Sequence, residues 1–130
     1  MRMHRQWKAW IVVLTVLAVF GAGLLAGAAN KPASVIHVVT VKWNEGTTPE
    51  QIQQALDGVE KMAKDFPGIK NVWLRSIKVQ GPESGVTHAF VMEFESQQAL
   101  KDYSGSAAQK EWYKSYLPIR ATSRTFDITN

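Results

Sequence analysis

Two histidines and one tyrosine are the side chains in this sequence best suited to proton transfer. His37 and His88 lie in apolar segments, and Tyr103 lies in a later amphipathic segment. An unperturbed imidazole titrates at a pH of about 6.5 and can exchange protons near neutrality, while a phenol can donate its hydroxyl to a carbonyl or an enolate. The structural alternative is that each histidine is a buried neutral imidazole bonded to a backbone group or to Tyr103. Both interpretations stay open.

The sequence lacks the residues that thiol, metal and phosphate-binding chemistry would require. The chain has 0 Cys, which excludes a disulfide framework, a thiolate nucleophile and a thiolate metal site. The third histidine, His4, lies in the N-terminal segment, and no histidine pair has the spacing of metal ligands on a helix. Because a glycine-rich phosphate loop is also missing, we expect neither a metal nor a cofactor.

Composition and charge predict a single packed domain. The chain has 130 residues, 45% of them apolar and 20% charged, which is typical of a globular protein. Its net charge of +4 arises from 15 basic and 11 acidic residues, but Arg2, Arg5 and Lys8 are three of the basic ones. The remainder, with 12 basic against 11 acidic residues, lacks the excess that binding to nucleic acid requires.

The N-terminus has the pattern of a targeting segment. A basic start precedes 21 uncharged residues, 9–29, and the small residues at 26–28 fit a signal-peptidase site. We therefore expect a signal peptide at 1–28, a short linker at 29–34 and a domain at 35–130, with the protein secreted or periplasmic. The alternative is an uncleaved anchor in the inner membrane with the domain outside, because such a run can cross about 30 Å of hydrocarbon.

Four segments have the β-branched and aromatic composition of strands. They are 35–43, 72–80, 88–95 and 122–128. A helix is predicted from Thr48, Pro49 and Gln51, which form a capping box with proline at the first helical position, up to Pro67. A second helical region follows Ser96 and continues, after an interruption at 104–106, through 107–117. The order β-α-β-β-α-β predicts a ferredoxin-like α+β fold with a four-stranded antiparallel sheet.

Alternation assigns the two faces of this sheet. The inner face, against the helices, carries His37, Val39, Val41, His88, Phe90 and Met92. The open face carries Ile36, Val38, Ala89 and Val91. Because exposed apolar area costs on the order of 25 cal/mol per Å², a second copy is the simplest cover, giving a dimeric α/β barrel. The alternative is a monomer, since Thr40, Lys42 and Glu93 share the open face.

Several of these segments resemble the stress-responsive α/β-barrel (Dabb) domain family. The resemblance rests on His37 with Lys42-Trp43, the loop at Gly68, the block T-H-A-F-V-M-E-F-E-S at 87–96, and Leu100-Lys101-Asp102-Tyr103, and it covers 35–128. It implies a dimeric ferredoxin-like barrel, found in small proteins of which a few, such as a plant polyketide cyclase, close rings on bound polyketides.

The resemblance also implies a site, with one departure. In the cyclase relatives, a tyrosine matching Tyr103 works with a histidine six residues later, and here that position is Gln109, which cannot act as a general base. Trp112 matches an aromatic position that lines the pocket. The candidate ligand-binding residues are His37, Val39, Val41, His88, Phe90, Tyr103, Gln109 and Trp112.

Together these observations predict an exported homodimer, of a family associated with stress, that binds a small apolar or aromatic compound between sheet and helices. A second hypothesis is a cofactor-independent cyclase, isomerase or monooxygenase-like enzyme that uses His37, His88 and Tyr103. A purely structural dimer is the third.

Overall fold

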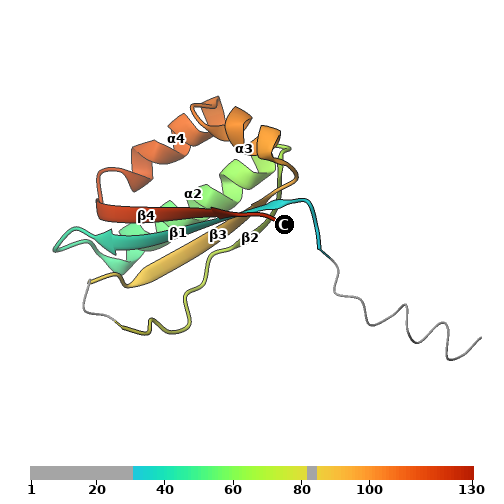
Figure 1. The fold of residues 1–130 in the computed structure, drawn as a ribbon. Coiled ribbons are helices and arrows are strands. Elements are labelled where there is room, and N and C mark those ends of the chain that lie inside the picture. The colour runs from blue at the N-terminus through green and yellow to red at the C-terminus, as the bar shows by residue number, and fades with distance from the viewer. Residues whose placement is uncertain (1–30, 82–84) are drawn as a thin grey trace, which may run out of the picture. The chain divides into compact units, whose positions relative to one another are not determined.

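The computed structural model describes residues 31–81 and 85–130, so the predicted signal peptide lies outside the described residues. Residues 32–130 form one compact unit (Figure 1). Its elements are β1 (Val35–Trp43), α2 (Pro49–Asp65), β2 (Ile69–Trp73), β3 (His88–Phe94), α3 (Gln97–Tyr103), α4 (Ala107–Tyr116) and β4 (Arg120–Ile128). Among the described residues, no helix has the length and apolar character needed to cross a membrane.

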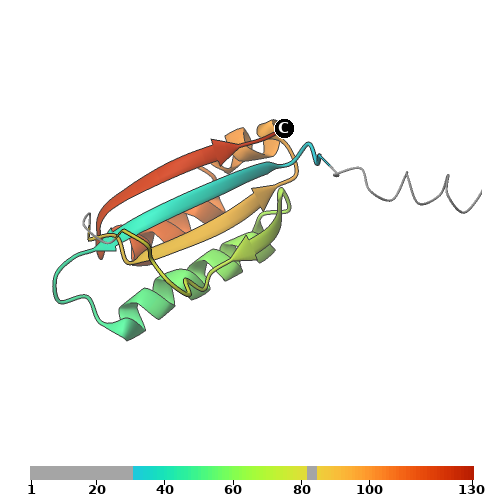
Figure 2. The same cartoon turned by 60° about the horizontal axis from the view of Figure 1, so that its bottom comes forward.

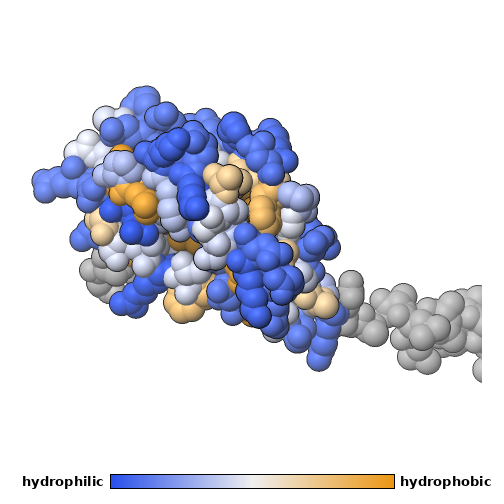
Figure 3. All heavy atoms as spheres, turned by 90° about the horizontal axis from the view of Figure 1, so that it is seen from above, coloured by the Kyte–Doolittle hydropathy of each residue, from blue (hydrophilic) through white to orange (hydrophobic). Residues whose placement is uncertain are grey.

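The four strands form one antiparallel sheet in the order β2-β3-β1-β4, which confirms the predicted ferredoxin-like α+β fold. The helices of the described residues all lie on one face of the sheet, and Figure 2 shows no helix on the other face, part of which is crossed by the coil after β2. From the helix side, charged and polar side chains dominate the surface, with small apolar patches between them (Figure 3). The functional geometry is therefore set by two layers, one of helices and one of strands.

Helix α2 begins and ends where local chemistry predicts. The Thr48 hydroxyl accepts a hydrogen bond from the Gln51 amide at 3.3 Å, and the Gln51 side chain accepts one from the Thr48 amide at 2.9 Å. This reciprocal pair satisfies two amides that the first turn of a helix leaves without partners. The helix ends at Phe66, before Pro67, and its inner side is buried in the core through Ala55, Leu56, Val59 and Met62.

Helix α4 packs unusually close to α2. A Cβ atom on Gly58 of α2 would lie 2.8 Å from Cδ1 of Trp112, so only glycine leaves room for the indole. At this contact the Trp112 indole N–H donates a hydrogen bond to the backbone carbonyl of Ala55 in α2 at 2.9 Å. No sequence pattern marks Gly58, although the missing side chain at this position is what allows Trp112 to lie against α2.

The second strand differs from its prediction. It runs over Ile69–Trp73 instead of 72–80, because regular pairing with β3 starts soon after Gly68 and stops at Trp73. Beyond it the Ser76 side chain replaces a backbone ladder: its hydroxyl donates to the Ala89 carbonyl at 2.9 Å and accepts from the Ala89 amide at 2.8 Å. The predicted strand at 74–80 is therefore not formed, and a side chain makes the contact to β3 there instead. β4 also starts earlier than predicted, at Arg120.

The open face of the sheet carries one apolar row that crosses all four strands. Strand register places Phe126, Val38, Val91 and Trp73 side by side in this row. Trp73 and Phe126 are 53% and 54% exposed, and Ile128, beside Ile36, is 56% exposed. Ile36, Val38, Ala89 and Val91 lie on this face as predicted, while the contributions of β2 and β4 enlarge it.

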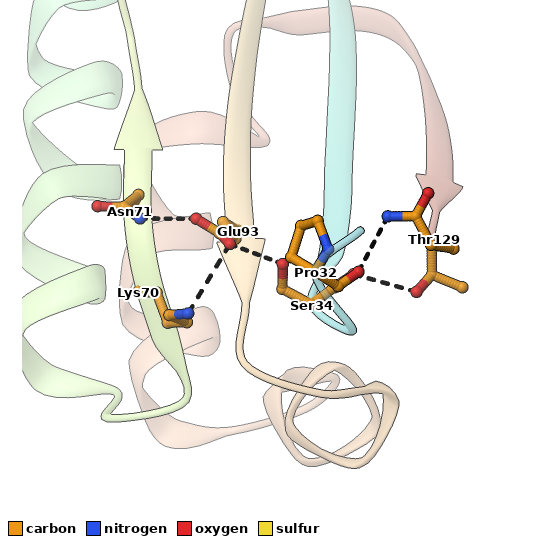
Figure 4. Close-up of polar contacts among 7 residues, drawn as sticks. Pro32, Ser34, Lys70, Asn71, Glu93 and Thr129 are labelled. Atoms are coloured by element: carbon orange, nitrogen blue, oxygen red, sulfur yellow. Dashed lines mark hydrogen bonds and ion pairs between the residues drawn. The ribbon is translucent and has the colours of Figure 1, made fainter. Parts of the chain in front are cut away.

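A polar cluster links Pro32 and Ser34, just before β1, and the C-terminal residues to one edge of the sheet (Figure 4). The Glu93 carboxylate accepts hydrogen bonds from Ser34 at 2.7 Å and from Asn71 at 2.6 Å, and these bonds lower the pKa of Glu93. The Thr129 hydroxyl donates to the Ser34 carbonyl at 3.1 Å, and the Asn130 side chain to the Pro32 carbonyl at 2.9 Å. These bonds link β1, β2, β3 and the C-terminus, so we assign the cluster a structural role.

Candidate functional site

The side chains that strand β4 points toward the helices are polar. Ser123, Thr125 and Asp127 pair with Val41, Val39 and His37 of β1 and therefore share the face that meets the helices. Phe126 and Ile128 point to the open face. This reverses the usual pattern, in which a strand turns its apolar residues toward the core. A polar inner strand implies that the space above it is not filled by apolar packing.

A cavity of about 360 Å³ occupies that space, between β1 and β4 on one side and α3 and α4 on the other. Of the predicted ligand-binding residues, His37, Val39, Tyr103, Gln109 and Trp112 line it. Val41, His88 and Phe90 do not. Residues that the sequence analysis did not select complete the lining, chiefly Tyr113, Tyr116, Arg120, Ser123, Thr125 and Asp127.

His37 meets the cavity paired with a carboxylate. Its Nδ1 lies 2.6 Å from Oδ1 of Asp127, and the His37 side chain is 13% exposed against 47% for Asp127. The rings of Phe94 and Tyr103 contact the imidazole edge-on, with centroids at 5.7 and 6.0 Å. In the neutral Nδ1–H tautomer, Nδ1–H donates a hydrogen bond to the Asp127 carboxylate, and Nε2 is the unprotonated, basic nitrogen. Asp127 therefore sets both the tautomer and the orientation of His37.

The helix side of the cavity is a wall of aromatic rings. The Trp112 and Tyr116 rings stack with centroids 4.5 Å apart and planes 13° apart, and the Tyr113 ring lies at a tilt to both. Burial raises the pKa of Tyr103, which keeps its phenol protonated and able to donate a hydrogen bond. Trp112 and Tyr116 are buried and Tyr113 is partly exposed, so the wall combines aromatic rings with phenol hydroxyl groups.

Gln109 is fully engaged in holding the turn between α3 and α4. Its side-chain oxygen accepts from the Gly105 amide at 2.6 Å, and its side-chain nitrogen donates to the Tyr113 hydroxyl at 3.1 Å. Its backbone amide donates to the hydroxyl of Ser106, the N-cap of α4, at 3.1 Å. Gln109 therefore positions Tyr113, and its neutral amide supplies no base.

His88 lies away from this cavity, so the expected convergence of the two histidines on one site is wrong. On β1, His37 and Val41, the partner of His88, are four residues apart, which is about 13 Å along a strand. The Trp43 indole N–H donates to Nδ1 of His88 at 2.9 Å. Because an indole only donates, Nδ1 must be unprotonated, and burial lowers the pKa of His88 accordingly. This matches the structural alternative of a neutral, partly buried histidine, although its partner is Trp43 and not a backbone group or Tyr103.

Arg120 and Tyr116 are two neighbouring residues of the cavity lining that sequence patterns did not reveal. The Arg120 guanidinium carbon lies 5.5 Å from the centroid of the Tyr116 ring. Arg120 Nε and the Tyr116 hydroxyl are both buried without a hydrogen bond of good geometry, and burial raises the pKa of Tyr116 by more than its contacts with Ser123 and Arg120 lower it. An arginine directly after an α4-to-β4 turn belongs to no motif, so only its position in the fold marks it.

Comparison with known proteins assigns the family. The model of the stress responsive A/B barrel domain, Dabb, matches residues 35–130. The chain belongs to the Dabb family. This confirms the resemblance drawn from the segments at 35–43, 87–96 and 100–103. The match includes both His37 and Arg120.

Individual relatives share the fold at low sequence identity. The stress-response A/B barrel domain-containing protein HS1 of Arabidopsis thaliana is 26% identical over 84 residues, which is 64% of this chain and 77% of HS1. The hydroxynitrile lyase of Passiflora edulis is 19% identical with a TM-score of 0.66, covering 75% of this chain and 93% of the lyase. A dimeric ferredoxin-like protein of unknown function from Thermobifida fusca is 15% identical with a TM-score of 0.65, covering 80% and 97%.

Proposed function

We propose that this Dabb protein is a homodimer that binds a small aromatic compound in the cavity between the sheet and helices α3 and α4. The observation that carries the proposal is the lining of the cavity, which is aromatic along α4 and polar along β4. A volume of about 360 Å³ lies within the range of small-molecule pockets, which pair apolar walls with a few oriented polar groups. An aromatic ring fits against the α4 wall, with polar substituents toward Ser123 and Thr125.

The dimer is supported by the open face of the sheet. The apolar row of Phe126, Val38, Val91 and Trp73 continues into a groove of about 700 Å³ beneath residues 75–81. Ile77 in the same segment is 96% exposed. Contiguous exposed apolar area of this kind marks an interaction surface. A second copy presents the same row, and the Thermobifida fusca neighbour with this fold is described as dimeric.

Ligand binding is tested by titrating the 130-residue protein with 2-naphthamide, a neutral two-ring probe, in a calorimeter. We expect one site per chain. Thr125→Phe fills the cavity from β4 and should abolish binding, whereas Thr122→Phe adds the same ring to the opposite face of β4 and should leave binding unchanged. Equal binding by wild type and both variants would overturn the assignment of the site, as would a wild type that takes up no probe.

A second candidate function, catalysis without a cofactor, is favoured by the contact between His37 and Asp127. A histidine held by a carboxylate can accept a proton at Nε2 while the carboxylate stabilises the imidazolium that forms. The fold neighbour from Passiflora edulis is a hydroxynitrile lyase. Turnover of mandelonitrile or of an aromatic polyketide should be lost in His37→Gln and retained in His88→Asn. Activity that survives in His37→Gln would remove the acid–base role.

We further propose that the protein is exported through residues 1–28 and acts as a secreted or periplasmic protein. The support is the basic start followed by an uncharged run and small residues at 26–28. N-terminal sequencing of protein from its own host should begin near residue 29. An intact N-terminus in a membrane fraction would instead favour the anchored alternative.

A further inference from the structure

We propose that Arg120 binds an acidic group on the ligand, so that the compounds taken up are aromatic carboxylates. This inference rests on the proposed function, because it specifies the chemical class that the same cavity selects. It is carried by a cation at the wall of a largely aromatic cavity, whose buried Nε has no hydrogen-bond acceptor in the described chain.

The guanidinium of Arg120 has few partners of its own. Its Nε is buried with no hydrogen-bond partner, and its Nη1 makes a long contact of 3.4 Å to the Ser123 hydroxyl. Within residues 31–81 and 85–130, no carboxylate lies within 4.0 Å of it. Burying a cation without an anion or a full set of acceptors is costly. A carboxylate, which can accept two parallel N–H bonds from a guanidinium, offsets this cost.

The surroundings of Arg120 also fix its orientation. The guanidinium carbon lies 5.5 Å from the centroid of the Tyr116 ring, and the same ring stacks on Trp112. The ring holds the cation against the wall that we assign to the ligand's aromatic part. A carboxylate at Arg120 therefore places an attached ring system along Trp112 and Tyr116.

The other charges of the cavity favour the same direction of binding. Asp127 lies seven residues along β4 from Arg120 and repels an acidic group from the His37 end. Lys101 on α3 also lines the cavity, but it is exposed, so water and salt screen its attraction. We therefore expect the acidic group of a ligand to bind at Arg120.

The test compares two probes of nearly the same shape, 2-naphthoate and 2-naphthamide, by calorimetric titration of the 130-residue protein. Charge-assisted hydrogen bonds predict that the wild type binds the acid roughly 10- to 100-fold more tightly than the amide. Arg120→Gln should remove this preference, so that the acid and the amide bind with affinities within about threefold of each other. Arg120→Lys should keep part of the preference, because it retains the charge without the planar pair of donors.

Two matched variants control for general charge effects. Arg124→Gln removes an arginine from the open face of the same strand, and Lys101→Gln removes the exposed cation at the cavity. Both should preserve the preference for the acid to within about threefold. Thermal melting of each variant establishes that it is folded.

The outcomes separate this inference from the proposed function. If the wild type binds acid and amide equally, or if Arg120→Gln keeps the preference while folded, the role of Arg120 is overturned and the cavity remains a binding site. If neither probe binds to the wild type, the proposed function itself fails. A preference lost in Lys101→Gln but not in Arg120→Gln would assign the anion to the mouth of the cavity instead.

Discussion

Asp127 sets the orientation of His37 from a position 90 residues later in the sequence. The two are register partners on the neighbouring strands β1 and β4, and their side chains meet at 2.6 Å on the inner face of the sheet. A histidine at the start of the first strand gains its partner only when the last strand completes the sheet. The pair joins the basic nitrogen of the site to the polar face of β4.

Replacing Asp127 should change the tautomer of His37 more than the stability of the protein. The carboxylate is 47% exposed, so Asp127→Ala should lower the free energy of unfolding by at most about 1 kcal/mol. Without an acceptor at Nδ1, the imidazole proton should move to Nε2, which is visible in nitrogen-15 NMR spectra of the ring. Asp57→Ala, which removes an exposed carboxylate from α2, is the control and should leave the His37 spectrum unchanged. An unaltered tautomer in Asp127→Ala would contradict the assigned role.

The stability of the protein should depend on pH through His88. Burial lowers the pKa of this histidine in the folded chain, below the unfolded value of about 6.5. The unfolded chain therefore binds the proton more readily than the folded chain. The full contribution of the neutral imidazole to the free energy of unfolding is present above about pH 6.5, and it is lost as the pH falls through the folded-state pKa. His88→Asn keeps an acceptor for the Trp43 indole but does not titrate.

Urea unfolding at pH 7.5 and pH 5 measures this effect. Wild type should lose more stability than His88→Asn on acidification. Trp43→Phe, which removes the indole donor and leaves His88 partly buried, should keep the wild-type dependence because burial is its cause. Parallel losses in wild type and His88→Asn would exclude His88 as the titrating group.

A charge in the apolar row of the open face should separate the protomers. Val91 lies between Val38 and Trp73 in that row, and a buried unpaired carboxylate at a dimer interface is strongly unfavourable. Val91→Asp should sediment as a monomer at micromolar concentration, where the wild type sediments as a dimer. Trp73→Asp, at the edge of the row, should weaken the dimer less.

Ala107→Asp is the matched control for the open face. It adds the same carboxylate at an exposed position on the helix side and should remain dimeric. Circular dichroism of each variant checks that the fold persists. A monomeric wild type, or a dimeric and folded Val91→Asp, would overturn the proposed interface.

Gly58→Ala should destabilise the protein although alanine favours helices. In a helix interior the exchange normally gains about 1 kcal/mol. Here the new Cβ would lie 2.8 Å from Trp112 Cδ1 and displace the indole from its bond to the Ala55 carbonyl, and a buried donor left without its partner costs about 1 to 3 kcal/mol. We expect a net loss of about 1 kcal/mol or more in urea unfolding, together with weaker binding of 2-naphthamide, because Trp112 lines the cavity.

Gln54→Ala on the exposed side of α2 is the control for Gly58→Ala. It should change the free energy of unfolding by no more than about 0.5 kcal/mol. A Gly58→Ala protein as stable as wild type would show that α4 can move away without cost.

The amino-acid sequence by itself determined the order of the elements and the faces of the two central strands. The start of α2 follows from Thr48, Pro49 and Gln51, whose hydrogen bonds lie within one helical turn. Val39 and Phe90 could be assigned to the inner face because alternation is a property of each strand alone. These features depend on residues close together in the chain, so their pattern can be recognised in the sequence.

Only the tertiary structure decided which of these residues form the cavity. The alternation of β4 does not say which side faces inward; pairing with β1 turns Asp127 toward His37 and Phe126 toward the open face. The length of β1 keeps His88 away from the cavity, and the turn after α4 brings Arg120 into it. Each of these outcomes depends on which strands pair and in which register, and such contacts join segments far apart in the chain and carry no local pattern.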